Sequence, residues 1–212
     1  MSPRPAQPPE RAEAKRSAII RATLDVIVDR GPAAVRLADV ASAVGMSVGT
    51  VQYYFASRNE LLAQSFSSHT ATVLTDIEKI ANAREDNRGH TARHRLHTAF
   101  AAIHEVGRHE QRSRIWLELV TVARTDRGLQ NCVDAVFDGW RGLFRQIIDD
   151  GAEQGEFRLG GLTVAEVVDT LTAIIDGFDL ATVAGHGPNP QTMARVLAAT
   201  AYRLLNEDGV GA

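Results

Sequence analysis

The chain has little of several features that would place it in a particular class of protein. It has one cysteine in 212 residues, so it cannot form an internal disulfide. Only 6% of its residues are aromatic, and no apolar run reaches the roughly 20 residues that a transmembrane helix needs. The first residues carry no hydrophobic stretch of the signal-peptide kind. These absences favour a cytoplasmic protein without a membrane partner.

Apolar residues make up 44% of the chain and recur mainly at helical spacing, with no alternating strand pattern of useful length. We therefore predict an all-α fold of about nine helices. Residues 1–9 hold four prolines and are expected to form a disordered arm, and residues 84–90 are expected to form a loop. The predicted helices span residues 10–30, 37–44, a short helix after Ser47, and then 57–83, 91–109, 112–125, 128–154, 163–184 and 190–206.

Residues 37–58 have the order of a helix-turn-helix. Apolar residues at 37, 40, 41 and 44 form one short helical face, and Gly45 can end that helix in the left-handed conformation. Ser47 can then cap a second helix, which is short and rich in hydroxyls. A polar, exposed second helix is typical of a helix that enters the DNA major groove.

Residues 16–64 resemble the TetR family of bacterial regulators. Gly31 and the residues at 40–41, 43–47, 49–51, 54–55, 57–58 and 60–62 carry the resemblance. The chain departs from it at Arg36, where a capping threonine is common, at Gln52, where tyrosine is frequent, and at Arg58, where lysine is usual. The resemblance implies a homodimeric regulator, most often a repressor, that leaves a pseudo-palindromic DNA operator when a small-molecule effector binds.

On this resemblance, residues 10–56 form a three-helix DNA-binding domain and residues 57–212 a larger domain for ligand binding and dimerisation. Residues 1–66 carry 8 basic and 6 acidic side chains, and residues 67–212 carry 15 and 20, so the head is the more basic part. The residues that would read base edges are Val48, Thr50, Gln52 and Tyr53, and those that would hold phosphates are Ser47, Tyr54 and Arg58. Arg36 would reach either a phosphate or the groove edge, and Gly49 would allow close approach of the backbone.

The second domain has an aromatic stripe, because residues 137, 140 and 144 share one helix face. Core packing and a ligand pocket both explain such a stripe. Residues 114–119 and 175–180 loosely resemble the ligand domain of the choline-responsive repressors, and a carboxylate near the rings would favour a cation. The candidate pocket residues are Phe100, His104, Trp116, Glu118, Phe137, Trp140, Phe144, Thr172 and Asp176.

Other chemistry finds less support in the sequence. His90, His94, His97 and His104 share one helix side, but neighbouring arginines favour a solvated face over a metal site. We predict no metal, no cofactor and no catalytic residue. Two alternatives remain. One is a helical enzyme or carrier, which a pair of carboxylates with strongly shifted pKa values would support. The other is a helical adaptor that has lost DNA binding.

The last two predicted helices, residues 163–184 and 190–206, carry long apolar faces. Burial inside one chain and burial against a second subunit both explain these faces. A single chain would have difficulty covering both sides of such a pair, and the TetR resemblance implies a four-helix bundle between subunits. We therefore predict a homodimer through residues 163–206.

Overall fold

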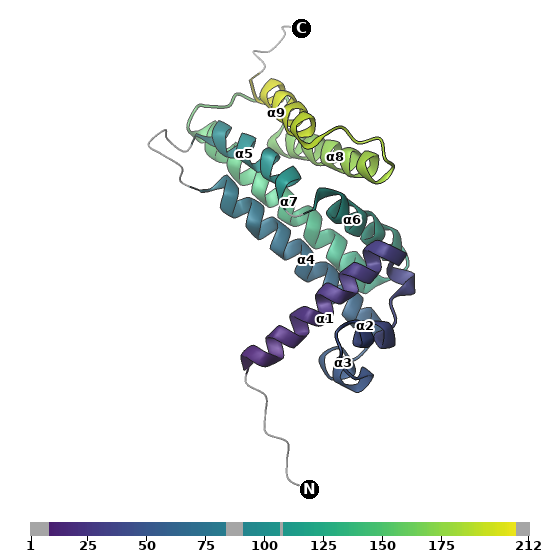
Figure 1. The fold of residues 1–212 in the computed structure, drawn as a ribbon. Helices are drawn as coiled ribbons and strands as arrows, with labels where there is room; N and C mark the ends of the chain where they lie inside the picture. Colours follow the sequence, from purple (N-terminus) through teal and green to yellow (C-terminus); the bar gives the residue numbers. More distant parts are fainter. Residues whose placement is uncertain (1–8, 84–90, 107, 207–212) are drawn as a thin grey trace. The chain divides into compact units, whose positions relative to one another are not determined.

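The computed structural model describes residues 9–83, 91–106 and 108–206 (Figure 1). In these residues all regular secondary structure is helical, which confirms the predicted fold class. The elements are α1 (Pro9–Arg30), η1 (Pro32–Ala34), α2 (Leu37–Ala43), α3 (Val48–Tyr54), α4 (Arg58–Ala81), α5 (Ala92–Glu105), α6 (His109–Ala123), α7 (Arg127–Glu153), α8 (Val164–Val183) and α9 (Pro190–Asn206).

Most predicted helix boundaries agree with the structure to within a few residues. Helix α1 already begins at Pro9, while the rest of the predicted arm and the predicted loop at 84–90 lie outside the described residues. The prediction for α5 was too long, because Val106 is extended and ends the helix (φ −67°, ψ 115°). Arg112 explains this end, since its guanidinium donates to the carbonyl oxygens of Ile103 and Val106.

The described residues form two compact units. The first comprises residues 9–69 and 118–132, and the second comprises residues 70–106, 108–117 and 133–206. The first unit therefore includes the start of α4 and a segment from the end of α6 to the start of α7, beyond the predicted 10–56 domain. None of the described helices has the length and apolarity needed to cross a bilayer.

In the first unit, α1 packs on η1 and α2, and α2 packs on α3. The core of this unit is made of fully buried side chains from each of these helices and from α4, among them Ile19, Val40, Val51, Phe55 and Phe66. Gly45 has a φ of 64°, the left-handed conformation that the turn between α2 and α3 requires. The helix-turn-helix predicted from the sequence is present.

Arg58, the first residue of α4, fastens the turn between α1 and α2. Its Nε donates to the carbonyl oxygen of Val35 at 2.8 Å, and its Nη2 donates to that of Pro32 at 2.5 Å. The same helix start has a side-chain cap, because Ser57 Oγ accepts from the backbone N–H of Glu60 at 3.1 Å. The predicted start of this helix is thus confirmed to within one residue.

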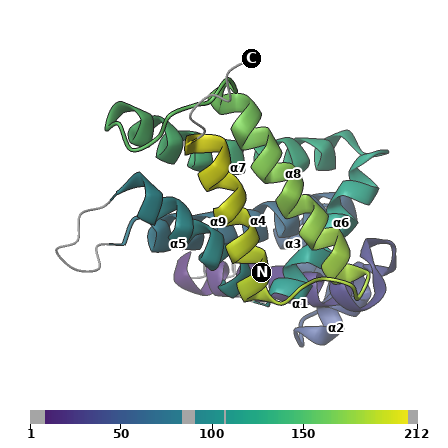
Figure 2. The same cartoon turned by 90° about the horizontal axis from the view of Figure 1, so that it is seen from above.

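In the second unit, α9 lies beside both α5 and α8 (Figure 2). One apolar core joins α4, α5, α7, α8 and α9, with Phe100, Phe144, Leu171 and Leu197 fully buried in it. Many apolar residues that suggested a subunit interface, including Val167, Val168, Leu171, Ile175, Leu197 and Ala201, are therefore covered within the chain. These residues therefore do not by themselves indicate a subunit interface, because they pack in one core with residues of α5 and α7.

Removal of the Arg58 side chain should destabilise the first unit. Arg58→Ala removes the Nε donor from the carbonyl group of Val35 and one of two donors from that of Pro32, which keeps the backbone N–H of Val35; the loss of these bonds should cost about 1–3 kcal/mol. Hydrogen exchange of the amides of Val40 and Val51 would report this loss locally. Arg36→Ala is the matched control, because Arg36 is exposed and makes no side-chain cap, so it should change stability by less than about 0.5 kcal/mol. Equal protection in both variants would contradict the role of Arg58.

Candidate DNA-binding and effector sites

Helix α3 is held at its start by a pair of hydroxyl groups. Ser47 is the N-cap, and its Oγ accepts from the backbone N–H of Thr50 at 3.1 Å and lies 2.8 Å from Thr50 Oγ1. These bonds satisfy one of the free N–H groups of the first turn. Both hydroxyls therefore help to build the helix, while Gly49, between them, is exposed and leaves the backbone open to a partner.

Helix α3, the second helix of the motif, has one exposed face. Val48 is 39% exposed and Tyr53 is 84% exposed, and Gln52 is exposed beside them. The Tyr53 and Tyr54 rings meet edge to face at 5.3 Å between centroids, so the exposed ring has a fixed neighbour. An amide and an aromatic ring on an exposed face can contact base edges and groove walls without any change in the core.

The phosphate contacts expected at the edges of α3 have unequal structural support. Arg36 is exposed beside the start of α2 and makes no cap with its side chain, so its charge is available to a partner. Arg58 instead uses its Nε and Nη2 on backbone carbonyl groups of the same unit. In this structure Arg58 therefore holds the turn, and its predicted phosphate contact stays a prediction.

Within the second unit, a hydrogen bond joins the aromatic residues to a carboxylate. Trp116 Nε1 donates to Asp176 Oδ1 at 3.1 Å, and the Trp116 ring meets the Phe137 ring edge to face at 5.5 Å between centroids. Trp140, on the same helix as Phe137, stacks on the Phe144 ring at 5.7 Å. Helices α6, α7 and α8 thus place two partly exposed indole rings, a phenyl ring and a carboxylate in one unit.

A second set of polar contacts lies next to Asp176. Arg112 Nη2 lies 3.1 Å from His109 Nδ1, so this nitrogen accepts and the ring proton is on Nε2, which donates to Thr182 Oγ1 at 3.3 Å. Ser113 Oγ donates to Asp179 Oδ1 at 2.7 Å. We name this group the polar cluster; it consists of His109, Arg112, Ser113, Trp116, Asp176 and Asp179.

Burial dominates the protonation equilibria of the polar cluster. It raises the pKa of Asp176 to about 6, against the opposing hydrogen bond from Trp116 and with the help of the negative charge of Asp179. It also raises the pKa of Asp179, against the bond from Ser113 and the charge of Arg112. The pKa of His109 is lowered to about 4, first by burial and then by Arg112. At neutral pH this imidazole is therefore uncharged.

The charges of the polar cluster do not balance once both carboxyl groups are ionised. Arg112 is its one basic side chain that stays charged, and burial lowers its pKa while Asp179 partly offsets that effect. Two carboxylates then face one guanidinium. An ionised Asp176 is unfavourable in the free protein, and a bound cation would remove that cost.

The other predicted pocket residues have different positions. Phe100 and Phe144 are fully buried core residues, and the hydroxyl of Thr172 is buried and bonded to the carbonyl group of Val168 in its own helix. Glu118 belongs to the first unit, where its carboxylate lies near Gly31. Core packing and a helix hydrogen bond thus account for Phe100, Phe144 and Thr172 without a ligand.

Sequence reasoning missed four members of the polar cluster: His109, Arg112, Ser113 and Asp179. A signal was available, because residues 109, 112, 113 and 116 follow a helical repeat and therefore share one face of α6. Asp179 follows Asp176 by three residues, which also places both on one face of an otherwise apolar helix. Polar residues repeated on one helix face inside an apolar domain thus indicate the site.

The histidines do not form a metal site in the described part of the chain. His94 and His97 are exposed, His104 is buried, and His90 lies outside the described residues. No group of three or more histidine, cysteine or acidic residues that could hold a metal ion occurs among the described residues.

The fold has many counterparts among solved structures. A transcriptional regulator from Saccharomonospora viridis in complex with choline is 23% identical with a TM-score of 0.79, over 92% of this chain and 99% of that chain. A TetR transcription regulator from Haloarcula marismortui is 18% identical with a TM-score of 0.79, over 92% and 100%. The regulator FadR from Bacillus subtilis in complex with stearoyl-CoA is 18% identical with a TM-score of 0.73, over 90% and 99%.

The sequence itself matches two protein families. Residues 19–64 match the bacterial regulatory proteins of the tetR family, a segment that includes the helix-turn-helix. Residues 92–206, more than half of the chain, match the C-terminal domain of BetI-type transcriptional repressors. With its capped and exposed α3 and its helical second unit, the chain belongs to the TetR family of transcriptional regulators, with a C-terminal domain of the BetI type.

Proposed function

We propose that this regulator is a homodimeric repressor that leaves its DNA operator when the second unit binds a small organic cation. The observation that carries the cation is the hydrogen bond from Trp116 Nε1 to Asp176 Oδ1 at 3.1 Å. It holds a partly buried carboxylate against an indole ring. The combination supplies Coulomb attraction and a ring face, the two features that recognise a quaternary ammonium group.

The geometry favours the indole rings over Phe137 as the surface for a cation. The guanidinium group of Arg141 already lies 5.4 Å from the centre of the Phe137 ring. Trp116 and Trp140 are partly exposed, and indole is the aromatic ring that attracts cations most strongly. The choline bound by the Saccharomonospora viridis regulator supports the same chemical class, so choline is the first ligand to test.

DNA binding would use the exposed face of α3. Gln52 can pair through two hydrogen bonds with adenine, while Val48 and Tyr53 would make apolar contacts with neighbouring bases. Arg36 would supply a phosphate contact. Two copies of α3 from a dimer would enter successive major grooves, about 34–36 Å apart on a pseudo-palindromic site.

The dimer would form through α8 and α9, within residues 163–206. The core residues of these helices are used inside the chain, but Leu180 remains 59% exposed on α8. Ala173 and Gly177 are also exposed on that helix, as is Ala184 just after its end, and these three residues and Leu180 are spaced three or four apart, so they share one helix face. Small residues around a large apolar side chain allow two helices to approach closely, which supports this surface as the subunit interface.

Release from DNA requires that the cation bind one conformation of the dimer more tightly than the other. A complete change from 1:99 to 99:1 needs a difference of about 5.5 kcal/mol in that binding. Helices α4, α6 and α7 are the covalent links through which such a difference would pass, because each has residues in both units.

Acid–base catalysis is a second candidate function, and one observation favours it: Asp176 and Asp179 are neighbouring carboxyl groups with raised pKa values. Membership of a regulator family favours the binding role instead. Trp116 and Ser113 hold one oxygen of each carboxyl group, which suits charge recognition. Recovery of choline unchanged after long incubation with the protein would exclude turnover of that ligand.

Gln52→Ala should relax sequence specificity at one base position in each half-site. The expected loss is about 1–3 kcal/mol of discrimination there, with little change elsewhere. Fluorescence anisotropy with a library of operator variants measures this loss of discrimination. The number of protein chains bound per operator, from the same titrations, tests the dimer. Arg36→Ala is the control: it should weaken binding to all sequences alike and reduce the salt slope by about 1. Equal losses at every position for Gln52→Ala would contradict the base contact.

Choline affinity should rise with pH and depend on Asp176. Because the pKa of Asp176 is raised to about 6 in the free protein, the carboxyl group is protonated below that pH and a cation must displace a proton. Affinity should therefore increase between pH 5 and pH 7 and then level off. The pKa values of His104 and His109 are about 4, so their titration lies below this range.

Titration calorimetry at pH 5, 6 and 7.5 would measure this dependence. Asp176→Asn should lower the affinity at pH 7.5 by about tenfold or more, as expected for the loss of a partly buried charge, and should remove the pH dependence. Asp169→Asn is a matched control, since Asp169 is an exposed residue of the same helix and bonds to Arg141. Similar choline affinity in Asp176→Asn and the wild type would contradict the cation site.

A further inference from the structure

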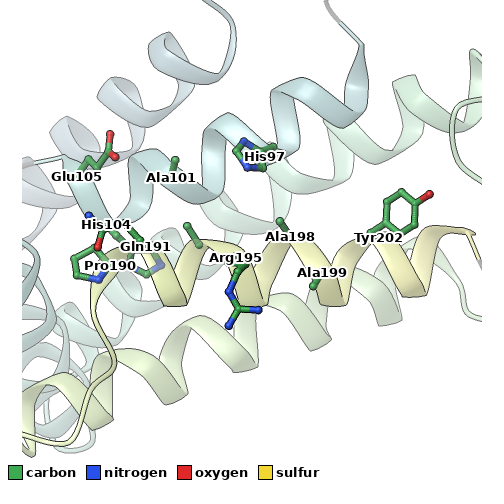
Figure 3. A pocket seen from close by; sticks show the side chains of 11 residues that line it. His97, Ala101, His104, Glu105, Pro190, Gln191, Arg195, Ala198, Ala199 and Tyr202 are labelled. Carbon is green, nitrogen blue, oxygen red and sulfur yellow. The ribbon is translucent and has the colours of Figure 1, made fainter.

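A groove of about 530 Å³ runs between α5 and α9 (Figure 3). Its walls are mainly apolar and small, with Ala101 on α5 and Ala194, Ala198 and Ala199 on α9. Small side chains on both helices leave space that larger ones would fill. The volume is in the range of small-molecule sites, which are typically lined by apolar groups with a few polar anchors.

His104 is the buried polar side chain of this groove (Figure 3). It is 4% exposed, and neither Nδ1 nor Nε2 has a hydrogen-bond partner among the described residues. A buried polar group without a partner is unfavourable, and such groups are rare in folded proteins. A ligand that bonds to His104 would recover this free energy.

The surroundings of His104 fix its charge state. Burial, followed by repulsion from His109 in its protonated form and from the charge of Arg112, lowers the pKa of His104 to about 4, so the imidazole is neutral at pH 7. The His109 ring meets it edge to face at 4.9 Å, and the Phe178 ring lies 6.4 Å away between centroids. A neutral imidazole offers one donor and one acceptor.

The chemistry of these neighbours selects the ligand class. The positive charge of Arg112 disfavours a cation at His104. At the edge of the groove, the attraction of Arg195 for an anion is offset by the repulsion from Glu105. A hydroxyl group both donates and accepts, so it complements the imidazole in either tautomer. We propose that the groove between α5 and α9 is a binding site for an uncharged, largely apolar alcohol or phenol whose hydroxyl group bonds to His104.

This site goes beyond the proposed cation site and does not depend on it. Asp176 and Trp116, which carry the cation proposal, do not line the groove. Loss of one site therefore leaves the other open to measurement. The competing occupant of the groove is a second copy of the chain, and this alternative predicts a different response in the experiment below.

The test is a titration of the full chain, labelled with ¹⁵N in its histidine rings, with 2-naphthol and with naphthalene. The two probes have the same fused ring, but only 2-naphthol has a hydroxyl group. We expect 2-naphthol to shift the His104 ring nitrogen resonances saturably, and naphthalene to leave these nitrogens close to their free positions. His104→Leu assigns the resonances and should weaken 2-naphthol binding about tenfold, the usual order for one buried hydrogen bond.

A second variant keeps the test valid if His104→Leu does not fold. Ala199→Phe adds a ring from an exposed position in the groove wall, so it should block 2-naphthol and leave the His104 resonances in place. Asp176→Asn should change 2-naphthol affinity less than twofold. Three results would overturn the proposal: no response to 2-naphthol, an equal nitrogen response to naphthalene, or His104 resonances that depend on protein concentration and not on either probe, as a second copy in the groove predicts.

Discussion

The arrangement of polar groups in the second unit depends on the hydrogen bonds and the charge of the Arg112 guanidinium group. It ends α5 by donating to the carbonyl groups of Ile103 and Val106, and it donates to His109 Nδ1. The same positive charge helps to hold His104 and His109 in their neutral forms and attracts Asp179. One partly buried arginine therefore sets a helix boundary, a histidine tautomer and the charge of the polar cluster.

Two consequences of this arrangement explain the proposed recognition chemistry. Arg112 is drawn to Asp179 and to backbone carbonyl groups, which leaves Asp176 as the carboxylate in excess, held in place by Trp116. In the groove between α5 and α9, His104 stays neutral and has no hydrogen-bond partner in the part of the chain that the structure describes. Arg58 has a comparable role in the first unit, where it fastens the turn before α2 and so supports the helix that presents Gln52 and Tyr53.

The sequence predicted the helices and the helix-turn-helix well, because caps, glycines and apolar spacing are local signals. Ser47 and Gly45 determine the start of α3 by themselves. Contacts between distant residues were not predictable in the same way: nothing near Arg58 in the sequence indicates that Pro32 and Val35 are its partners, and the end of α5 depends on Arg112. Burial also could not be read from spacing, so Phe100, Phe144 and the apolar faces of α8 and α9 were assigned to a pocket and an interface although the core accounts for most of them.

The central claim is that cation binding in the second unit and DNA binding by α3 are coupled. The most direct test measures the affinity of the full chain for DNA from beside its own gene with and without saturating choline, and its affinity for choline with and without that DNA. Coupling predicts that choline weakens DNA binding and that DNA weakens choline binding by the same factor, because linkage is reciprocal. Saturable choline binding that leaves the DNA affinity unchanged would contradict the account.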